Sequence, residues 1–171
     1  ITSPDAIVLD DAIGGAPAIV RSPREQWLAA RRELVTASDV AAIIGEDERR
    51  GPLAVWAEKV GDVAAEETVP MRRGRRFEAA IVEEYADQTG RSAGASKPYT
   101  IRRHPSIPWL GATLDALTAP SAATPGPLPD WPDRSLVPLQ VKMAIGSARD
   151  WKGEPPLGYV VQVQVETACA D

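Results

Sequence analysis

Two short segments of the chain, residues 110–115 and 139–143, alternate between apolar and more polar positions with the period of two that is typical of β-strands. On this pattern Asp115 lies on one face of the first strand, and Gln140 and Lys142 share one face of the second. We expect a hairpin-like return to bring Asp115 beside Gln140 and Lys142. An acid, a second oxygen ligand and a lysine on neighbouring strands can hold a hard divalent cation next to a phosphodiester.

Capping residues and glycines predict three short helices in the first part of the chain. Ser22 and Glu25 provide a capping box at the start of the first helix. A second helix is expected within residues 36–45, where a box-like start precedes a closing glycine, and a third within residues 51–61, which begin with Gly-Pro and end with Gly. Residues 99–103 are expected to form another strand.

A longer helix is expected over residues 71–89, with Gly90 as its stop. At about 100° per residue, Glu78 falls in the middle of an apolar stripe made by Met71, Gly74, Ile81, Val82 and Tyr85. A carboxylate on such a stripe is costly unless it is paired, hydrogen-bonded or bound to a metal. Glu78 is therefore either a metal-site residue or a buried acid paired with an arginine, and its position leaves both interpretations open.

The rest of the chain indicates one domain with two irregular segments. Residues 1–21 are expected to form an N-terminal arm, whereas residues 22–171 are expected to fold as a single domain. The Pro-rich residues 119–138 are expected to form a long surface loop inserted in the hairpin. Residues 159–165 alternate like a strand but also suit a helix, so the pattern alone leaves their structure open.

Composition narrows the class of protein without identifying it. The single cysteine excludes an internal disulfide and a Cys-rich zinc site, and the single histidine argues against a multi-histidine metal centre. No apolar run approaches the ~18 residues of a membrane span, and no signal-peptide pattern is present, so no membrane partner and a cytoplasmic setting are the expectation. The net charge of −5 is a mild argument against a nucleic-acid binder, but arginines cluster, as within residues 72–76, and can form local basic patches for DNA.

Five segments, WLAARRELVTASDVAAIIG, GPLAVWAEKVG, RGRRFEAAIVEEY, HPSIPWLGATLDAL and YVVQVQ, occur in this order along the chain. Asp115 followed by Gln140-Val141-Lys142 looks like the PD-(D/E)xK nuclease signature, with its second acid changed to glutamine. Together they resemble the lambda-exonuclease and YqaJ-like family of phage recombination nucleases over roughly residues 24–165. Five ordered segments are much more specific than the signature alone, which arises by chance in many chains.

The resemblance implies an α/β fold, a restriction-endonuclease-like core with a mixed β-sheet flanked by α-helices, and a helix over residues 159–165. It implies a Mg²⁺-dependent deoxyribonuclease, in which Mn²⁺ would substitute, and specifically a 5′→3′ exonuclease on double-stranded DNA ends in phage-type recombination. The partners expected with this activity are a single-strand annealing recombinase and further copies of the chain in a homo-oligomer. A core of this type continues with another strand and helix, so we expect the chain to be truncated at its C-terminus.

The family pattern assigns a catalytic role to each residue of the signature. Asp115 is the candidate bridging metal ligand, and Gln140 and the Val141 carbonyl would supply neutral oxygens. Glu78 would hold metal-bound water, and Lys142 would orient the attacking water and offset charge in the transition state. Taken alone, Asp115 would more often be a turn-forming residue near a strand end, and it is the neighbouring segments that favour the metal role.

Arg31 and Ser38 match the family positions that hold the terminal 5′-phosphate of DNA. Ser38 is expected in the first turn of its helix, where free N–H groups favour an anion, and Arg31 offers a planar fork of donors. The alternative is an ordinary exposed arginine and a capping serine. Gln164, with Gln162 in reserve, is expected to reach the nucleophilic water or the scissile phosphate. Because the two diverge by about 200° on a helix, only one of them can face the site.

Gln140 is where the chain departs from the family pattern, because a carboxylate normally stands at this position. Glutamine keeps the shape and one oxygen but loses a full charge, so weaker metal binding is expected. Three origins stay open: an engineered change, a natural variant, or the loss of catalysis. The alternative function is therefore a catalytically disabled DNA-end-binding module with the same fold.

Overall fold

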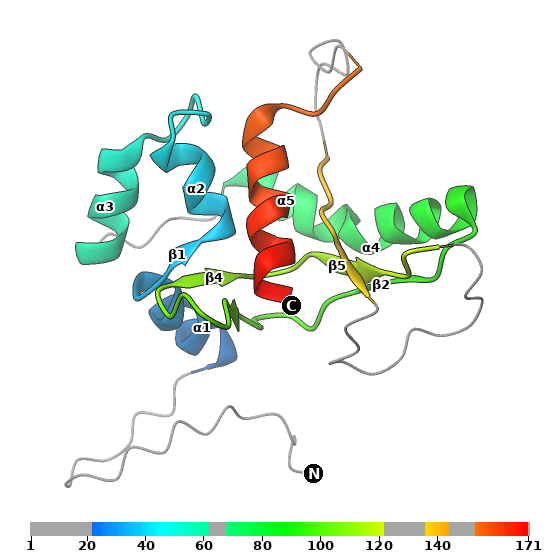
Figure 1. Cartoon of the computed structure of the whole chain (residues 1–171), viewed down its shortest axis with the longest axis horizontal. Helices are drawn as coiled ribbons and strands as arrows, with labels where there is room; N and C mark the ends of the chain where they lie inside the picture. The colour runs from blue at the N-terminus through cyan, green and yellow to red at the C-terminus, as the bar shows by residue number, and fades with distance from the viewer. Residues whose placement is uncertain (1–21, 62–67, 122–135, 144–152, 171) are drawn as a thin grey trace, which may run out of the picture.

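The structure is a computed structural model in which residues 22–61, 68–121, 136–143 and 153–170 are described. In chain order its elements are α1 (Pro23–Arg32), β1 (Val35–Thr36), α2 (Ala37–Ile43), α3 (Pro52–Val60), α4 (Val69–Thr89), β2 (Ala93–Ala95), β3 (Arg102–Arg103), β4 (Leu110–Ala112), β5 (Ala116–Thr118), β6 (Val137–Leu139) and α5 (Leu157–Ala170), as labelled in Figure 1. The expected N-terminal arm, residues 1–21, and most of the expected Pro-rich loop lie outside the described residues.

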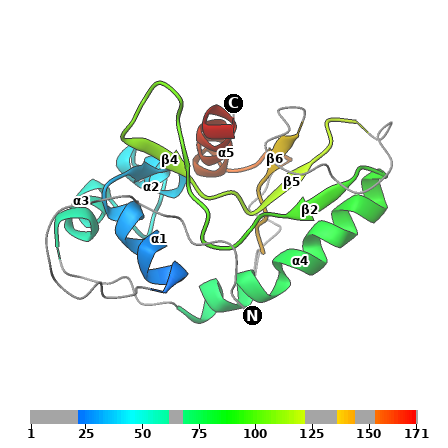
Figure 2. The same cartoon turned by 90° about the horizontal axis from the view of Figure 1, so that it is seen from below.

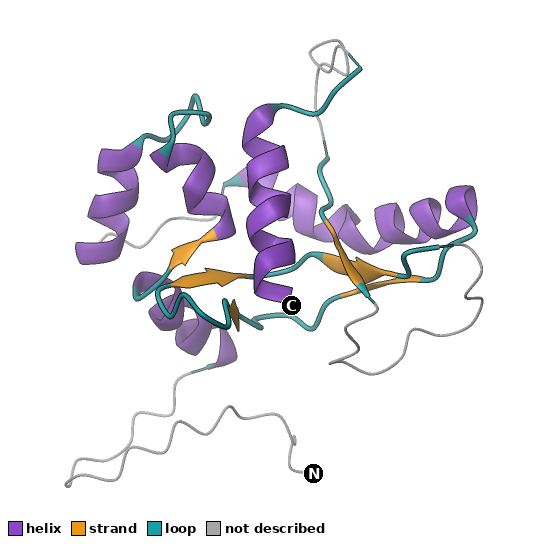
Figure 3. Ribbon diagram, in the orientation of Figure 1, coloured by secondary structure: helices purple, strands orange, loops and turns teal. Residues whose placement is uncertain are grey.

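The described strands form two three-stranded sheets with helices packed against them (Figure 3). In the mixed sheet, β1 runs parallel to β4 and β3 runs antiparallel to it. The second sheet has the order β2-β5-β6 and is antiparallel throughout. The short helices α1, α2 and α3 lie in the part of the molecule that contains the mixed sheet, whereas α4 lies along the second sheet (Figure 1).

The strand expected over residues 110–115 ends after Ala112, so its second half is wrong. β4 ends at Ala112 and β5 begins at Ala116. Between them, the Asp115 carbonyl oxygen accepts a hydrogen bond from the Ser96 N–H at 2.9 Å. All three residues of β5 are buried, because both faces of the strand are covered, and alternation is then a poor guide to its geometry. The break places Asp115 at the junction of the two sheets.

The second expected strand also ends earlier than its pattern indicated. β6 stops at Leu139, and Gln140 and Lys142 follow directly after it. The hairpin-like return is present, since β6 pairs with β5 in antiparallel register. The strand expected over residues 99–103 is reduced to β3, and Tyr99 at its expected start has a φ of 59°, which is not extended backbone.

Local capping chemistry predicted where the helices start and stop. The capping box between Ser22 and Glu25 opens α1, and a second box between Thr36 and Asp39 opens α2. α4 ends at Gly90, which has a φ of 65° in the left-handed region that glycine adopts without strain. These features depend on neighbouring residues alone, which is why the sequence pattern predicts them well.

α5 is the helix that the family resemblance implied for residues 159–165, and the strand-like alternation there was misleading. It packs against α2, β4 and β6 (Figure 2). The fit is close, because a Cβ atom on Gly158 would lie 2.9 Å from the carbonyl oxygen of Glu46. The apolar core around α5 consists of Ala37, Ala112, Leu114, Leu117, Leu136 and Cys169. α5 therefore packs between α2 and β6.

α4 covers the second sheet from its other side. It packs against β2, and Val82 joins Ala116 and Val141 in a smaller apolar cluster (Figure 2). The segment that follows β6 is thus held between α4 and α5. Within the described part of the chain, none of the helices combines the length and apolarity needed to cross a membrane.

Candidate active site

Asp115 and Gln140 meet where the β5–β6 pair ends. The antiparallel register pairs Ala116 with Leu139. Asp115 and Gln140 are the next residues outward, so they lie opposite each other. The Gln140 side-chain nitrogen donates a hydrogen bond to Asp115 Oδ2, and the Val141 backbone N–H donates to the same oxygen at 3.0 Å. The structure thus places Asp115 beside Gln140, as the hairpin-like return predicted.

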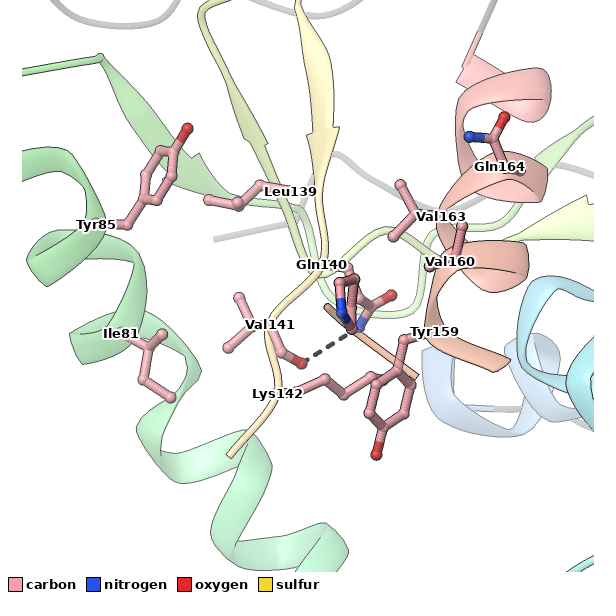
Figure 4. A pocket seen from close by; sticks show the side chains of 11 residues that line it. Ile81, Tyr85, Leu139, Gln140, Val141, Lys142, Tyr159, Val160, Val163 and Gln164 are labelled. Carbon is pink, nitrogen blue, oxygen red and sulfur yellow. Dashed lines mark hydrogen bonds between the residues drawn. The ribbon is translucent and has the colours of Figure 1, made fainter. Parts of the chain in front are cut away.

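Lys142 and Glu78 lie around this contact. Lys142 is exposed, and its Nζ lies 5.3 Å from the ring centroid of Tyr159 in α5. Glu78 is half-buried on α4 and close enough to Asp115 for the two carboxylates to repel each other. Figure 4 shows Lys142 and its neighbours in the chain between α4 and α5. The candidate acids and the candidate lysine therefore interact electrostatically, whereas the hydrogen bonds to Asp115 come from Gln140 and the Val141 backbone N–H.

Gln162 is the glutamine of α5 that contacts Gln140. Its Nε2 donates to Gln140 Oε1 at 2.7 Å and to Glu166 Oε1 at 2.9 Å. The sequence favours Gln164 for this place, with Gln162 as the alternative. In the structure Gln164 is exposed and lines a neighbouring cavity, because two residues along a helix change the direction of a side chain by about 200°.

Glu166 is a member of this group that the sequence analysis missed. Its side chain is only 1% exposed, and its Oε2 has no hydrogen-bond partner among the described residues. The signal that could have found it is the spacing of four residues from Gln162, which brings two side chains together on a helix. That signal becomes usable only once residues 159–165 are known to be helical.

Burial raises the pKa of each of the acids near this contact. For Asp115, burial is the main cause, and the hydrogen bond from the Val141 N–H and the nearby charge of Lys142 partly offset the rise in pKa. For Glu78, burial raises the pKa most and the charge of Asp115 adds to it. For Glu166, burial raises the pKa to about 7, with a smaller increase from Asp115 and an opposing hydrogen bond from the neighbouring amide. The positive charge of Lys142 only partly offsets these rises, so a further cation placed among the acids would be stabilised.

The oxygen atoms of this group are of the kind that a hydrated magnesium ion prefers, with one departure. Among the described residues, no three His, Cys, Asp or Glu side chains converge as a metal site. Glu78, Asp115 and the Val141 carbonyl offer the hard oxygen ligands that Mg²⁺ prefers, and water would complete its coordination. The departure is Gln140, which turns its nitrogen toward Asp115 and its oxygen toward Gln162. Gln140 would therefore have to rotate before it could serve as an oxygen ligand.

A cavity of about 450 Å³ adjoins this group between α4, β6 and α5. Most of its lining is apolar and comes from Ile81, Tyr85, Leu139, Val141, Pro155, Tyr159, Val160 and Val163. Gln140, Lys142 and Gln164 contribute polar atoms to its wall (Figure 4). An apolar surface thus lies directly beside the polar group.

Arg31 and Ser38 form a second group, at the corner between α1 and α2. The Arg31 guanidinium donates to Ser38 Oγ at 3.1 Å and to Thr36 Oγ1 at 3.4 Å. It also lies 4.7 Å from the ring centroid of Trp27. Trp27 Nε1 donates to Thr113 Oγ1 at 3.0 Å, which connects this group to the segment between β4 and β5. Burial lowers the pKa of Arg31, but a guanidinium remains charged at neutral pH.

Asp39 is the buried acid of this second group, and the sequence indicated only its place in a helix cap. Its side chain is 1% exposed and accepts hydrogen bonds from the Thr36 N–H at 2.8 Å and the Thr36 hydroxyl at 2.7 Å. Lys59 Nζ lies 2.6 Å from Asp39 Oδ2, and Arg50 contacts Oδ1. Burial alone would raise the pKa of Asp39, but the hydrogen bonds from Lys59, Thr36 and Arg50 lower this pKa to about 2.

Comparisons with known proteins identify the family and the fold of the chain. Residues 26–171 match the family model described as the YqaJ-like viral recombinase domain. The uncharacterized protein YqaJ of Bacillus subtilis (strain 168) is 24% identical over 144 residues, which cover 82% of this chain and 40% of that protein. The chain therefore matches less than half the length of this relative. The crystal structure of LHK-Exo in complex with dAMP is 23% identical with a TM-score of 0.55, over 85% of this chain and 68% of that one. This likeness confirms the expected α/β, restriction-endonuclease-like fold.

Proposed function

Because the chain belongs to the family of YqaJ-like viral recombinase domains, we propose that it is a Mg²⁺-dependent deoxyribonuclease. It degrades double-stranded DNA 5′→3′ from its ends in phage-type recombination, Mn²⁺ substitutes for Mg²⁺, and a single-strand annealing recombinase receives the exposed strand. The observation that carries the proposal is the contact between Asp115 and Gln140, with Glu78 and Lys142 around it. Acids and a lysine around one point are the groups that metal-assisted phosphodiester hydrolysis requires.

The residues of the candidate active site divide the work of hydrolysis among them. A bound, hydrated magnesium ion supplies an activated water and offsets charge on the transferring phosphoryl group. Asp115, Glu78 and the Val141 carbonyl are the groups that would hold it. Lys142 is exposed at the border of the site, where its charge stabilises the negative charge that develops in the transition state. Gln162 keeps the Gln140 amide in a defined place through its 2.7 Å hydrogen bond.

Arg31 and Ser38 support a preference for a 5′-phosphate at the DNA end. The guanidinium is already oriented by Ser38, Thr36 and the Trp27 ring, so little side-chain freedom is lost when it binds an anion. Its planar fork of donors suits phosphate oxygens. The Trp27–Thr113 hydrogen bond links this group to the segment that leads to the acids, which suits a substrate held at its end and cut nearby.

The second candidate function is a DNA-end-binding module whose metal site is disabled. The orientation of Gln140 favours it, because the amide nitrogen satisfies Asp115 with a neutral hydrogen bond where the family pattern has a carboxylate. Glu78, Asp115 and Lys142, which are all retained, favour the enzyme. Catalysis therefore depends on whether Asp115 is available to a cation.

Cleavage of 5′-phosphorylated linear duplex DNA, with Mg²⁺ and with Mn²⁺, separates the two functions. We expect the wild-type chain to release nucleotides from the 5′ end, and Asp115→Asn to lower the rate by at least about 10³-fold, because several kcal/mol of charge stabilisation would be lost. Glu33→Gln is the matched control, since Glu33 is an exposed acid that faces Arg103 at 3.7 Å.

Three outcomes of this assay contradict parts of the proposal. A chain that binds duplex ends but cleaves with neither metal would identify a disabled binding module. Equal rates for Asp115→Asn and the wild type would mean that the nuclease site lies elsewhere. Release from the 3′ end would remove the polarity while leaving the activity.

A further inference from the structure

Glu166 ends a continuous chain of hydrogen bonds that starts at Asp115. Asp115 accepts from the side chain of Gln140, and Gln140 accepts from Gln162 at 2.7 Å. Gln162 also donates to Glu166 at 2.9 Å. Two carboxylates therefore lie at the two ends, and two amides lie between them. The chain runs from the junction of β5 and β6 into the middle of α5.

The acids at the ends determine which way both amides point. An ionised carboxylate accepts hydrogen bonds and has no proton to donate. Gln140 therefore turns its nitrogen to Asp115, which leaves its oxygen to accept from Gln162. Gln162 meets both this oxygen and Glu166 with its nitrogen. Turning over either amide would set oxygen against oxygen, so both ends select the same arrangement.

Glu166 is costly to keep in this position. Its side chain is 1% exposed, one carboxylate oxygen has no partner among the described residues, and the other meets a neutral amide. Burial raises its pKa to about 7, and the charge of Asp115 adds to the rise. An apolar side chain of similar size would avoid this cost. What the acid contributes is its hydrogen bond to Gln162.

We propose that Glu166 is a positioning residue: through Gln162, it holds the Gln140 amide with its nitrogen toward Asp115. The inference rests on the proposed function, in which Asp115 and Gln140 form part of the nuclease site. Without Glu166, the Gln162 amide loses one of its two acceptors and Asp115 alone selects the orientation of both amides, so the arrangement is held less firmly. Glu166 acts on the site only through these two amides.

Side-chain amide signals in the ¹⁵N NMR spectrum of the whole chain test this arrangement in the absence of metal and DNA. Glu166→Leu removes the acceptor and keeps an apolar side chain of similar size, whereas Glu166→Gln keeps an acceptor oxygen. We expect Glu166→Leu to shift the NH₂ signals of Gln162 and also those of Gln140, which Glu166 does not touch. Glu166→Gln should leave both sets near their wild-type positions. Thr167→Ala, at the exposed next residue of α5, is the control.

Cleavage of duplex DNA by the same variants provides the second readout. Because Gln140 must turn its oxygen toward a cation before it can act as a ligand, Glu166→Leu should lower the Mg²⁺ concentration that gives half-maximal cleavage by about tenfold. Glu166→Gln should keep the wild-type concentration. A merely structural acid would show no such difference between the two variants, since both remove the charge. If Glu166→Leu fails to fold, Glu166→Met takes its place, because methionine adapts to irregular surroundings.

The outcomes separate this proposal from the proposed function. Unchanged Gln140 signals in the folded Leu or Met variant would overturn the positioning role, and so would the same Mg²⁺ dependence of cleavage in the Leu and Gln variants. A wild-type chain that cleaves no DNA would overturn the proposed function, while the NMR comparison would still decide whether Glu166 sets the two amides.

Discussion

Asp39 and Glu166 are two carboxylates with the same burial and opposite acidity. Each side chain is 1% exposed. At Asp39, hydrogen bonds from Lys59, Thr36 and Arg50 overcome the effect of burial and lower the pKa to about 2. At Glu166, the donor is the neutral amide of Gln162, and burial raises the pKa to about 7.

The comparison shows that the kind of donor, and not burial, decides what a buried acid does. A neighbouring cation offsets most of the solvation energy that a carboxylate loses when it is buried, whereas a neutral amide offsets only part of it. The Asp39 group is therefore a closed set of opposite charges that keeps the α1–α2 corner rigid around Arg31. The group from Asp115 to Glu166 keeps a deficit of positive charge, which is the property expected where a cation binds.

Removing the acid from the closed group should have the largest effect on stability. Asp39→Ala removes the carboxylate that Lys59 and Arg50 share; Arg50 keeps Glu58 at 3.0 Å, whereas Lys59, whose side chain is only 18% exposed, loses its ion pair with Asp39. We expect the free energy of unfolding to fall by roughly 3–5 kcal/mol, measured by urea denaturation. Glu33→Ala removes an exposed acid that faces Arg103 and should cost roughly 0–1 kcal/mol. Equal losses in the two variants would show that Asp39 is no more tightly coupled than a surface acid.

Replacing the other acid should change stability in a pH-dependent way and with the opposite sign. The pKa of Glu166 is raised from its ordinary value of 4.5 to about 7, so the folded state holds a proton that the unfolded state has released between those values. The contribution of Glu166 to stability should therefore fall as the pH rises from about 4.5 to about 7.

Glu166→Gln removes this titration and measures it directly. At pH 8 the variant should be more stable than the wild type by about 2–3 kcal/mol, and at pH 4 the two should be nearly equal. Urea denaturation at pH 4, 6 and 8 checks the difference. A constant difference across this range would show that the pKa of Glu166 is the same in the folded and unfolded states.

Truncating Arg31, at the α1–α2 corner beside this closed group, should change DNA recognition more than stability. Arg31→Ala should reduce the preference for 5′-phosphorylated over 5′-hydroxyl ends by about 10–100-fold, because a charge-assisted contact worth about 1.5–3 kcal/mol is lost. Affinity for the two kinds of end, measured side by side, gives this ratio. Arg32→Ala, at the exposed neighbour on the same helix, is the control. Equal weakening of both ends by Arg31→Ala would indicate general DNA binding instead.

The features predicted from sequence are those that depend on nearby residues or on a simple pairing. The capping boxes of α1 and α2 are local, and both are present. The meeting of Asp115 with Gln140 needed only the return of one strand beside another. The helical state of α5 came from the family resemblance, because its alternating valines and glutamines suit a strand as well.

The features that sequence reasoning missed are set by distant parts of the chain. The division between β4 and β5 depends on the layers that cover β5, and no pattern within residues 110–118 reports them. The difference between Asp39 and Glu166 depends on whether Lys59 or Gln162 lies beside the acid, which only the folded chain determines. The choice between Gln162 and Gln164 similarly depends on which face of α5 is turned toward Gln140, and only the folded chain determines this.

A titration of Mg²⁺ into the wild-type chain and into Gln140→Glu tests the central claim most directly. A carboxylate at position 140 adds a negative charge close to Asp115. At an effective dielectric near ~20, a positive and a negative unit charge a few ångströms apart attract each other by about 4 kcal/mol, and the cost of desolvating the carboxylate reduces this gain. We predict that the Mg²⁺ concentration at the midpoint of the titration, measured by calorimetry and by cleavage rate, falls at least about tenfold in Gln140→Glu. Without metal, this variant should be slightly less stable than the wild type, because its acids repel one another. Identical midpoints in the two chains would mean that residue 140 does not belong to a metal site, and would contradict the assignment of Asp115, Gln140 and Lys142 as the nuclease centre.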